Sequence, residues 1–496
     1  MHHLSALCVS MRNVLRSLGF LLLSTIAYSV AYPQQLQALH GSSYAGYLAN
    51  SYNPAAILNS SKKWDVSLLG IQYASVTNGG FVQGANIPGL LRQSARDSME
   101  WITYNGHFRR YFHLNGSFDV LGIRYRIGSD AAISFGVRMQ GYTHFTTNSI
   151  EYNDRMNRIN GFFNGNQTTP EFESRFQSAN ALVYSFGFSK MLYQTEQGRL
   201  QGGVRLHYQQ GIAGMYGRVQ DVRATQVAVP NLGARYQLLN ARGEYGYSGN
   251  LDEVLNTPKG TTANVNSVFQ GLQGTFGADI GLEYVFYNAN SAYFDRKWED
   301  YSAKISLAIL DIGRTKYPYG KYSTAFTQLQ PVVLDTSLQR LFDNATGLGA
   351  FTDTLRRFIL QNPDTLQGVF AINNPTRVVL NTDVALGGNF YVNADLQMNL
   401  YSTREMGVNN TRNINLLTVT PRIETQQLGF YLPIRYTSEG NCWVGMGAKL
   451  GPVIFGLHNL GWLFGNNKLP NGGGYFTLQI RSKDKEEGQE VPCPRF

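Results

Sequence analysis

The chain has 496 residues, a formal charge of +9 and only 15% charged residues, although its mean hydropathy is slightly negative at −0.23. About 25% charged residues is usual for soluble domains, so the composition disfavours an ordinary soluble protein. It favours a wall in which lipid-facing and water-facing side chains alternate. We find no basic tract with interleaved aromatic residues, and we therefore expect no nucleic-acid partner.

The first 31 residues have the pattern of a cleaved signal peptide. Arg12 and Arg16 form a basic region, residues 15–26 include an apolar run, and residues 29–31 (Ser-Val-Ala) form a small-x-small cleavage site. The apolar run is shorter than the roughly 20 residues of a spanning helix, so an uncleaved anchor is the weaker alternative. We expect an exported chain without helical membrane spans.

Residues 32–63 do not alternate as a strand does. They are rich in small residues and contain the turn Asn53-Pro54-Ala55 shortly before the first predicted strand, which starts at Trp64. Small side chains let a backbone pack closely against a neighbouring wall, and the proline fixes one bend.

From residue 64 onward, long segments alternate between apolar and polar residues. The clearest is 390–401, in which Phe, Val, Ala, Leu, Met and Leu alternate with Tyr, Asn, Asp, Gln, Asn and Tyr. Such alternation predicts β-strands. Several runs reach eleven residues, which fits the roughly 9–11 residues of a tilted membrane strand better than the roughly 5–6 of a sandwich strand. We therefore predict an all-β fold, a transmembrane antiparallel β-barrel.

Short and long connections alternate along the chain. Residues 128–130 and 195–198 are short links, whereas 149–177 and 217–274 are long. Short periplasmic turns and long outer loops produce this pattern, so we expect the cell outer membrane of a Gram-negative bacterium. We predict about fourteen strands, and a strand pair hidden in 217–274 would make sixteen. The predicted strands are 64–75, 114–127, 131–145, 179–193, 200–216, 275–287, 301–310, 377–386, 390–402, 413–423, 428–437, 442–450, 453–464 and 474–482.

The Asn-Pro-Ala turn before the first strand resembles that of the FadL/PorV-like barrels. Residues 310–313 (Leu-Asp-Ile-Gly), 374–377 (Asn-Pro-Thr-Arg) and 450–452 (Leu-Gly-Pro) also look like an uncharacterised Bacteroidota outer-membrane family related to that group. The resemblance implies fourteen strands and an N-terminal segment that lies inside the barrel as a plug. The implied organisation is a signal peptide (1–31), a plug (32–63), a barrel (64–482) and a charged periplasmic tail (483–496).

Charged residues on the polar faces of the predicted strands should point into the lumen, where water or the plug can solvate them. We expect them to form a polar network, and we count the plug turn Asn53-Pro54-Ala55 with them among the residues that matter for function. A plug that merely seals the barrel and a plug that gates it both remain open. The predicted lumen residues are Arg124, Arg138, Arg205, Asp279, Glu283 and Lys304.

The long connection 315–375 contains an amphipathic helical pattern. Leu355, Phe358 and Ile359 fall at helical spacing. Our hypothesis is that this helix forms an outer lid with an apolar capture site. The alternative is a loop helix that packs on its neighbours.

Neither an enzyme nor a cofactor protein is expected. No nucleophile-elbow, P-loop or zinc-protease pattern occurs in the required strand–turn–helix context. His144 and His207 lie within predicted strands, as lumen residues rather than as a catalytic pair. Cys442 and Cys493 have no metal-ligand spacing, and we expect a membrane to separate them, so that they do not form a disulfide.

Two functions remain for such a barrel. The first is the binding or passage of hydrophobic or amphipathic small molecules, with outer-membrane lipid as the surroundings. The second is a role as a non-transporting structural or adaptor partner of an envelope complex for secretion or surface attachment. An apolar route past the plug, or a lateral opening, would favour the first. A sealed lumen with an exposed apolar patch on the outer loops would favour the second.

Overall fold

The computed structural model describes residues 37–83, 100–153, 156, 158–169, 171–252, 267–288, 300–343, 347–401, 408–464 and 471–482. The predicted signal peptide and the predicted tail, with Cys493, lie outside these residues. In the part of the chain that is described, no helix has both the length and the apolar character to cross a membrane.

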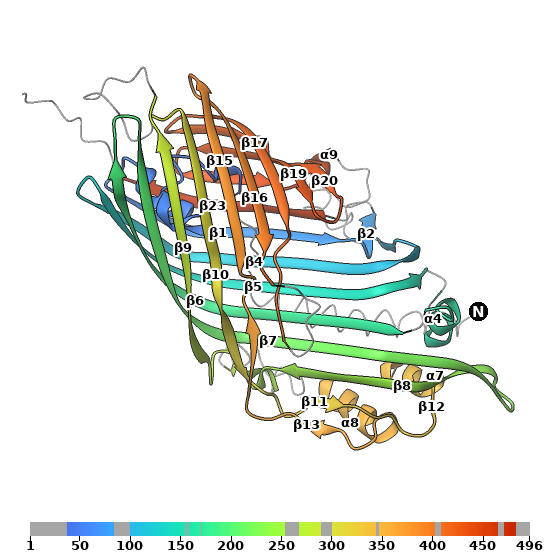
Figure 1. Cartoon of the computed structure of the whole chain (residues 1–496). Helices are drawn as coiled ribbons and strands as arrows, with labels where there is room; N and C mark the ends of the chain where they lie inside the picture. Colours follow the sequence, from blue (N-terminus) through green and yellow to red (C-terminus); the bar gives the residue numbers. More distant parts are fainter. Residues whose placement is uncertain are drawn as a thin grey trace, which may run out of the picture.

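Fourteen antiparallel strands close into a barrel, which confirms the predicted fold class and strand number (Figure 1). The first and last strands pair from Asp65–Arg481 to Val76–Asn471 and so close the ring. Two of the fourteen are each interrupted once, β18 with β19 and β20 with β21. The ring runs through β1 (Trp64–Thr77), β4 (Gly106–Ile127), β5 (Ala131–Tyr152), β6 (Phe172–Gln194), β7 (Gly198–Val229), β9 (Gln273–Phe286), β10 (Ala303–Pro318), β15 (Arg377–Gly387), β16 (Phe390–Asn399), β17 (Leu416–Glu424), β18 (Leu428–Tyr431) with β19 (Ile434–Thr437), β20 (Cys442–Val444) with β21 (Met446–Leu450), β22 (Val453–Leu457) and β23 (Asn471–Arg481).

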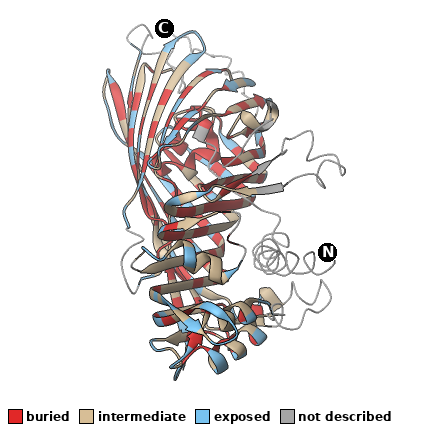
Figure 2. Cartoon of the chain, turned by 90° about the vertical axis from the view of Figure 1, so that its right-hand side faces the viewer, coloured by how far each residue is buried: buried red, intermediate tan, exposed pale blue. Residues whose placement is uncertain are grey.

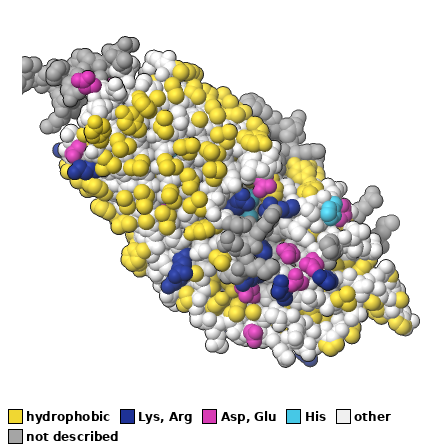
Figure 3. Space-filling view, in the orientation of Figure 1, with side chains coloured by type: hydrophobic (Ala, Val, Ile, Leu, Met, Phe, Trp, Pro, Cys, Tyr) yellow, Lys and Arg dark blue, Asp and Glu magenta, His cyan; other side chains and the backbone are white. Residues whose placement is uncertain are grey.

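Side chains along the ring alternate between an apolar exterior and a polar interior. On neighbouring strands, Phe186 and Leu206 pair across the outer face and are exposed, whereas Arg205 points inward and is buried. The space-filling view shows a broad hydrophobic surface over the barrel strands, with charged side chains gathered toward the other end of the molecule (Figure 3). This is the pattern of a wall between lipid and a polar lumen.

The strands differ greatly in length at one end of the barrel. The end with the short turns, such as 128–130 and 195–197, is called the inner end here, and the opposite end the outer end. β4 to β7 run past the ring at the outer end and form an extension to one side of it (Figures 1 and 2).

The long segment 217–274 does not add a strand pair to the barrel. β7 pairs with β9 over residues 198–211, and its outer part, 215–229, pairs instead with β8 (Gly233–Tyr247). β8 therefore belongs to the extension, and the alternative of sixteen strands is wrong. Short elements complete the extension: α4 (Ile159–Gly165), α7 (Asp335–Asp343), α8 (Leu348–Phe358), η4 (Gly249–Leu251), β11 (Thr324–Phe326), β12 (Val333–Leu334) and β13 (Asp364–Thr365).

The remaining elements are short. β14 (Val369–Asn373) continues the wall beside β10, and β2 (Gly80–Gln83) pairs with β3 (Glu100–Thr103) in a separate two-stranded sheet. The predicted strand 453–464 is too long, because β22 ends at Leu457 and α9 (Gly461–Phe464) follows. Asn459 accepts a hydrogen bond from the backbone N–H of Gly461 at 2.8 Å, which starts the helical turn.

Residues 37–60, called the N-terminal segment below, contain η1 (Gln37–Leu39), η2 (Gly46–Ser51) and η3 (Pro54–Asn59). They contact inward-facing groups on distant parts of the ring. The backbone N–H of Tyr47 donates to Asp65 on β1 at 2.6 Å, and Asn50 donates to Ser134 on β5 at 2.9 Å. The segment therefore contacts inward-facing side chains on several strands of the ring, near its inner end. Its apolar residues form a core with wall side chains: Ala38, Leu39, Ala45, Tyr47, Leu48, Ala49, Tyr52, Ala56, Ile57, Leu58, Ala132, Tyr431, Ile454 and Tyr475.

Candidate functional site

The turn Asn53-Pro54-Ala55 begins η3 by a local capping arrangement. The Asn53 side chain accepts a hydrogen bond from the backbone N–H of Ala55 at 2.9 Å, as an N-cap asparagine does, and Pro54 occupies the first helical position. The same side chain donates to the backbone carbonyl of Leu282 on β9 at 3.0 Å. One asparagine thus starts the helix and ties it to the wall.

Two glycines in the wall make room for this turn. Gly203 on β7 and Gly281 on β9 are cross-strand partners. A Cβ atom at Gly281 would overlap the Asn53 side chain, and one at Gly203 would overlap the backbone between Pro54 and Ala55. The turn therefore lies directly against bare backbone, an approach that any larger residue would prevent.

Arg124 connects the N-terminal segment to two strands. Its guanidinium pairs with Asp65 at 2.5 Å and donates to the backbone carbonyls of Ile57 and Lys62 at 3.3 and 2.5 Å. Asp65 in turn accepts from the backbone N–H of Tyr47. A buried carboxylate and a buried guanidinium thus satisfy backbone groups that water cannot reach.

Glu283 and Lys304 hold the same segment at two other places. Glu283 accepts from the side-chain amide of Asn59 at 2.5 Å and from Gln201 at 2.7 Å. Lys304 donates to the carbonyl of Gly41 at 2.8 Å and to the hydroxyl of Ser43 at 2.7 Å. Arg124, Glu283 and Lys304 therefore contact the N-terminal segment directly, and a fourth predicted lumen residue, Arg138, contacts it through Ser51.

Arg138, Arg205 and Asp279 lie farther toward the outer end. Arg138 is 3.3 Å from Asp119 and 3.3 Å from the hydroxyl of Ser51. Arg205 donates to Asp279 at 2.6 Å, and His207 contacts the same carboxylate at 2.8 Å. The structure places all six residues in the barrel interior, and Arg138 and Arg205 line the same cavity.

A polar cavity lies directly beyond the N-terminal segment. Its volume of about 40 Å³ is enough for a few water molecules. Arginine, aspartate, amide and hydroxyl groups dominate its surface. The lining residues are Ser51, Gln72, Asn115, Gly116, Ser117, Arg138, Gln140, Tyr142, Arg205, Asp311, Arg377 and Asn413.

Several buried charges of the lumen were not predicted. Arg422 pairs with Asp383 at 2.5 Å and with Glu424 at 3.2 Å, and Arg377 pairs with Asp311 at the cavity. The signal was present, because these residues alternate with outward apolar residues in the predicted strands. Strict inward and outward counting along 377–386 and 413–423 would have found Arg377, Asp383 and Arg422.

The predicted lid residues do not form one exposed face. α8 covers most of the predicted helical pattern, but Leu355 and Ile359 are buried in a core with Leu341 and Val333 of the same extension. Only Phe358 is exposed, at 54%. This packing agrees with the alternative of a loop helix packed on its neighbours, and α8 lies in the extension beside the ring (Figures 1 and 2).

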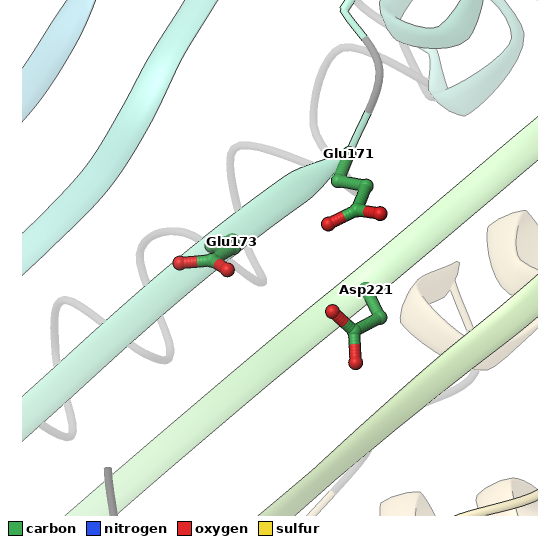
Figure 4. Close-up of side chains that lie close together, drawn as sticks. All are labelled: Glu171, Glu173 and Asp221. Carbon is green, nitrogen blue, oxygen red and sulfur yellow. The ribbon is translucent and has the colours of Figure 1, made fainter.

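Three carboxylates meet on the extension. Glu171 directly precedes β6, Glu173 lies on β6 and Asp221 lies on β7. Each brings one carboxylate oxygen within 4.8 Å of the others (Figure 4). Arg223 pairs with Glu171, and Arg242 pairs with Asp221. Because two of the three charges already have cationic partners, we assign no metal to this cluster.

The closed ring, its apolar exterior and its polar, partly filled interior define a β-barrel of the outer-membrane type. Within this class, residues 54–458 match the sequence profile of a family of unknown function, DUF5723. The chain belongs to this family. No curated protein sequence matches it.

Among solved structures, the chain is similar to the toluene transporter TbuX of Ralstonia pickettii, with 13% identity over 88% of this chain and 94% of that one and a TM-score of 0.37. A FadL homologue of Pseudomonas aeruginosa has 11% identity over 90% of this chain and 97% of that one, with a TM-score of 0.39. The TodX deltaS2S3 mutant monoaromatic hydrocarbon channel has 12% identity over 88% of this chain and 97% of that one, with a TM-score of 0.37. With scores this low, the substrates of those channels remain properties of those proteins.

Proposed function

We propose that this protein lies in the outer membrane of a Gram-negative bacterium and binds or passes hydrophobic or amphipathic small molecules, with the N-terminal segment as a movable plug. One observation carries the proposal. Hydrogen bonds to inward side chains hold the segment, and a cavity lies on its outer side. Separate polar contacts can be replaced by contacts with water one at a time, so the segment can move stepwise. A strand that is hydrogen-bonded along its whole length to a neighbour could not move in this way.

The chemistry of the interior favours an amphipathic solute over a purely apolar one. An apolar cluster lines the outer half of the lumen, formed by Val76, Tyr111, Ile414 and Leu416 with Trp443 packed against it. Asn413, next in sequence to Ile414, already belongs to the polar cavity. A molecule with an apolar body and a polar group would therefore meet first the apolar cluster and then the polar cavity as it enters from the outer end.

A disulfide between the plug and the wall tests the proposed movement. Asn50 and Ser134 are hydrogen-bonded at 2.9 Å, so cysteines at both positions would face each other across the same contact, and non-reducing electrophoresis shows whether they form the bridge. In a background with Cys442→Ser and Cys493→Ser, we expect the oxidised N50C/S134C protein to take up radiolabelled decanoate into intact cells at least tenfold more slowly than its reduced form.

The single N50C variant is the matched control and should not respond to oxidation. Equal uptake by the locked and reduced double variant would show that the segment does not move during passage. The barrel could then still bind the solute, but the gating part of the proposal would be lost.

A second candidate function, the adaptor of an envelope complex, rests on the extension. Leu239 on β8 and the neighbouring Val332, before β12, are exposed at 60% and 65%, away from the barrel wall. If this pair docks a protein, the double variant L239S/V332S should lose a partner that co-purifies with the wild-type protein while decanoate uptake stays unchanged. Unchanged co-purification would count against the adaptor role of this surface.

The orientation in the membrane can be tested with a native thiol. Cys442 is exposed at the start of β20, at the outer end, and it forms no disulfide in the described part of the chain. With Cys493→Ser, we expect a membrane-impermeant maleimide to label Cys442 in intact cells, since exposed thiols react when deprotonated. Labelling only after permeabilisation of the outer membrane would show that the barrel has the opposite orientation.

A further inference from the structure

One guanidinium in the barrel interior has no hydrogen-bonding partner. Arg435 on β19 is 1% exposed, and none of its three nitrogens donates a hydrogen bond. The other arginines buried to this degree in the described chain, Arg124, Arg205 and Arg422, each pair with a carboxylate. An isolated buried charge is strongly unfavourable, so Arg435 requires a compensating group.

Three further polar side chains around Arg435 also lack partners. Both ring nitrogens of His458 and the hydroxyl groups of Tyr475 and Tyr52 are buried without a hydrogen bond. The rings of His458 and Tyr475 are 5.6 Å apart, and both tyrosines are electrostatic neighbours of Arg435. Seven unpartnered polar atoms therefore converge from β19, β23, the residue after β22 and the end of η2.

The nearest carboxylate attracts Arg435 but makes no ion pair with it, so it compensates the charge only in part. Asp395 on β16 accepts a hydrogen bond at 3.0 Å from Gln397 and contacts the Nδ1 atom of His40 at 2.5 Å. His40 belongs to the N-terminal segment and stacks on Tyr52 with ring centroids 4.8 Å apart. The aspartate is thus held by the segment, and no ion pair joins it to Arg435.

The chemistry of the unpartnered groups selects an anion. A guanidinium only donates hydrogen bonds, and the hydroxyl groups and a neutral imidazole can each contribute a further donor. The Tyr475 hydroxyl lies against Gly447 and Gly456, where a Cβ atom would overlap it, and neither glycine offers it a polar side chain. Water would satisfy some of the donors but would leave the positive charge uncompensated.

We propose that Arg435, His458, Tyr475 and Tyr52 form a binding site for a small monovalent anion of chloride size. The anion contacts the barrel wall through Arg435, His458 and Tyr475 and the N-terminal segment through Tyr52. It therefore stabilises the segment in its observed position. This site is independent of the solute that the barrel binds or passes.

The test uses the full mature chain in detergent, with bromide as the probe. The protein is first exchanged into sodium gluconate, whose anion is much larger than chloride or bromide, and sodium bromide then replaces it at constant ionic strength. For the wild type, we expect a saturable rise in the thermal midpoint. In crystals grown in bromide, an anomalous peak should lie within hydrogen-bonding distance of the Arg435 guanidinium.

The variant R435Q distinguishes this site from an ordinary structural contact. In gluconate, we expect R435Q to unfold at a higher temperature than the wild type, because the uncompensated charge is gone, and bromide should no longer raise its midpoint. A surface control, R223Q, should keep the full bromide response. A variant that is less stable than the wild type in both salts, or one that still responds to bromide, would overturn the proposal.

A second variant keeps the test decisive if R435Q does not fold. Y475F removes one donor and leaves the charge, so we expect about tenfold weaker bromide binding, the usual effect of losing one hydrogen bond to a charged group. An unchanged half-saturation concentration, or crystals with water alone at Arg435, would show that the cluster does not bind an anion.

Discussion

Replacement of Arg422 by leucine is expected to lower the free energy of unfolding by about 3–5 kcal/mol, the usual cost of removing one partner from a buried ion pair. Arg422 donates to both oxygens of Asp383, at 2.5 and 2.8 Å, and to the hydroxyl of Tyr301 at 3.0 Å. It also pairs with Glu424. Without the guanidinium, Asp383 keeps hydrogen bonds from Tyr301 and Asn393, and Glu424 keeps its contacts with Tyr431 and Lys449, but both buried carboxylates lose their closest cationic partner.

Equilibrium urea unfolding in lipid vesicles, followed by tryptophan fluorescence, measures this effect. The matched control is Arg223→Leu, which breaks the ion pair with Glu171 on the surface of the extension. We expect little change there, because water and salt screen exposed ion pairs. If both substitutions had equal effects, the buried ion pairs would not be a main source of barrel stability.

Replacement of Leu206 by arginine is expected to cost about 2–4 kcal/mol, as charged residues do on the lipid face of a barrel near the middle of the membrane. Leu206 on β7 is 56% exposed and pairs with outward-facing Phe186. Leu239 on β8 provides a close control, since it is the same residue type and is 60% exposed, but it lies in the extension. Leu239→Arg should therefore leave the stability nearly unchanged.

Folding into lipid vesicles compares the two variants directly. The two leucines have the same side chain and nearly the same exposure. A difference in stability between the two variants therefore reports whether lipid or water surrounds the leucine. If Leu206→Arg were tolerated as well as Leu239→Arg, water rather than hydrocarbon would cover the barrel surface. The assignment to a membrane would then be wrong, and the proposed function would fail with it.

Local sequence pattern predicted the barrel well, for a physical reason. Each strand places alternate residues on opposite faces, so the run 390–401 specifies its own inner and outer surfaces without reference to its neighbours. The strand count followed from the same signal. Positions such as Arg205 and Asp279 could be assigned to the interior by counting from an apolar neighbour, and the structure places both of them there.

The errors in the sequence analysis share another cause. The predicted strand 453–464 is too long because Asn459 caps the helical turn that follows β22. Whether residues 217–274 add strands to the barrel depends on which segment they pair with, and the outer part of β7 pairs with β8. The helical spacing around Leu355 indicated a helix, but periodicity does not specify which surface covers its apolar face. In the structure, residues of the extension itself cover most of that face.

The sequence by itself determined which side chains point into the lumen and which point outward, because alternation is a property of a single extended chain. Only the tertiary structure decided which inward charges meet. Arg124 finds Asp65 on the adjacent strand, whereas Arg435 finds no carboxylate, although both residues carry the same pattern in the sequence. Ion pairing depends on the stagger of neighbouring strands and on where the N-terminal segment lies, and neither is encoded in the local period of two.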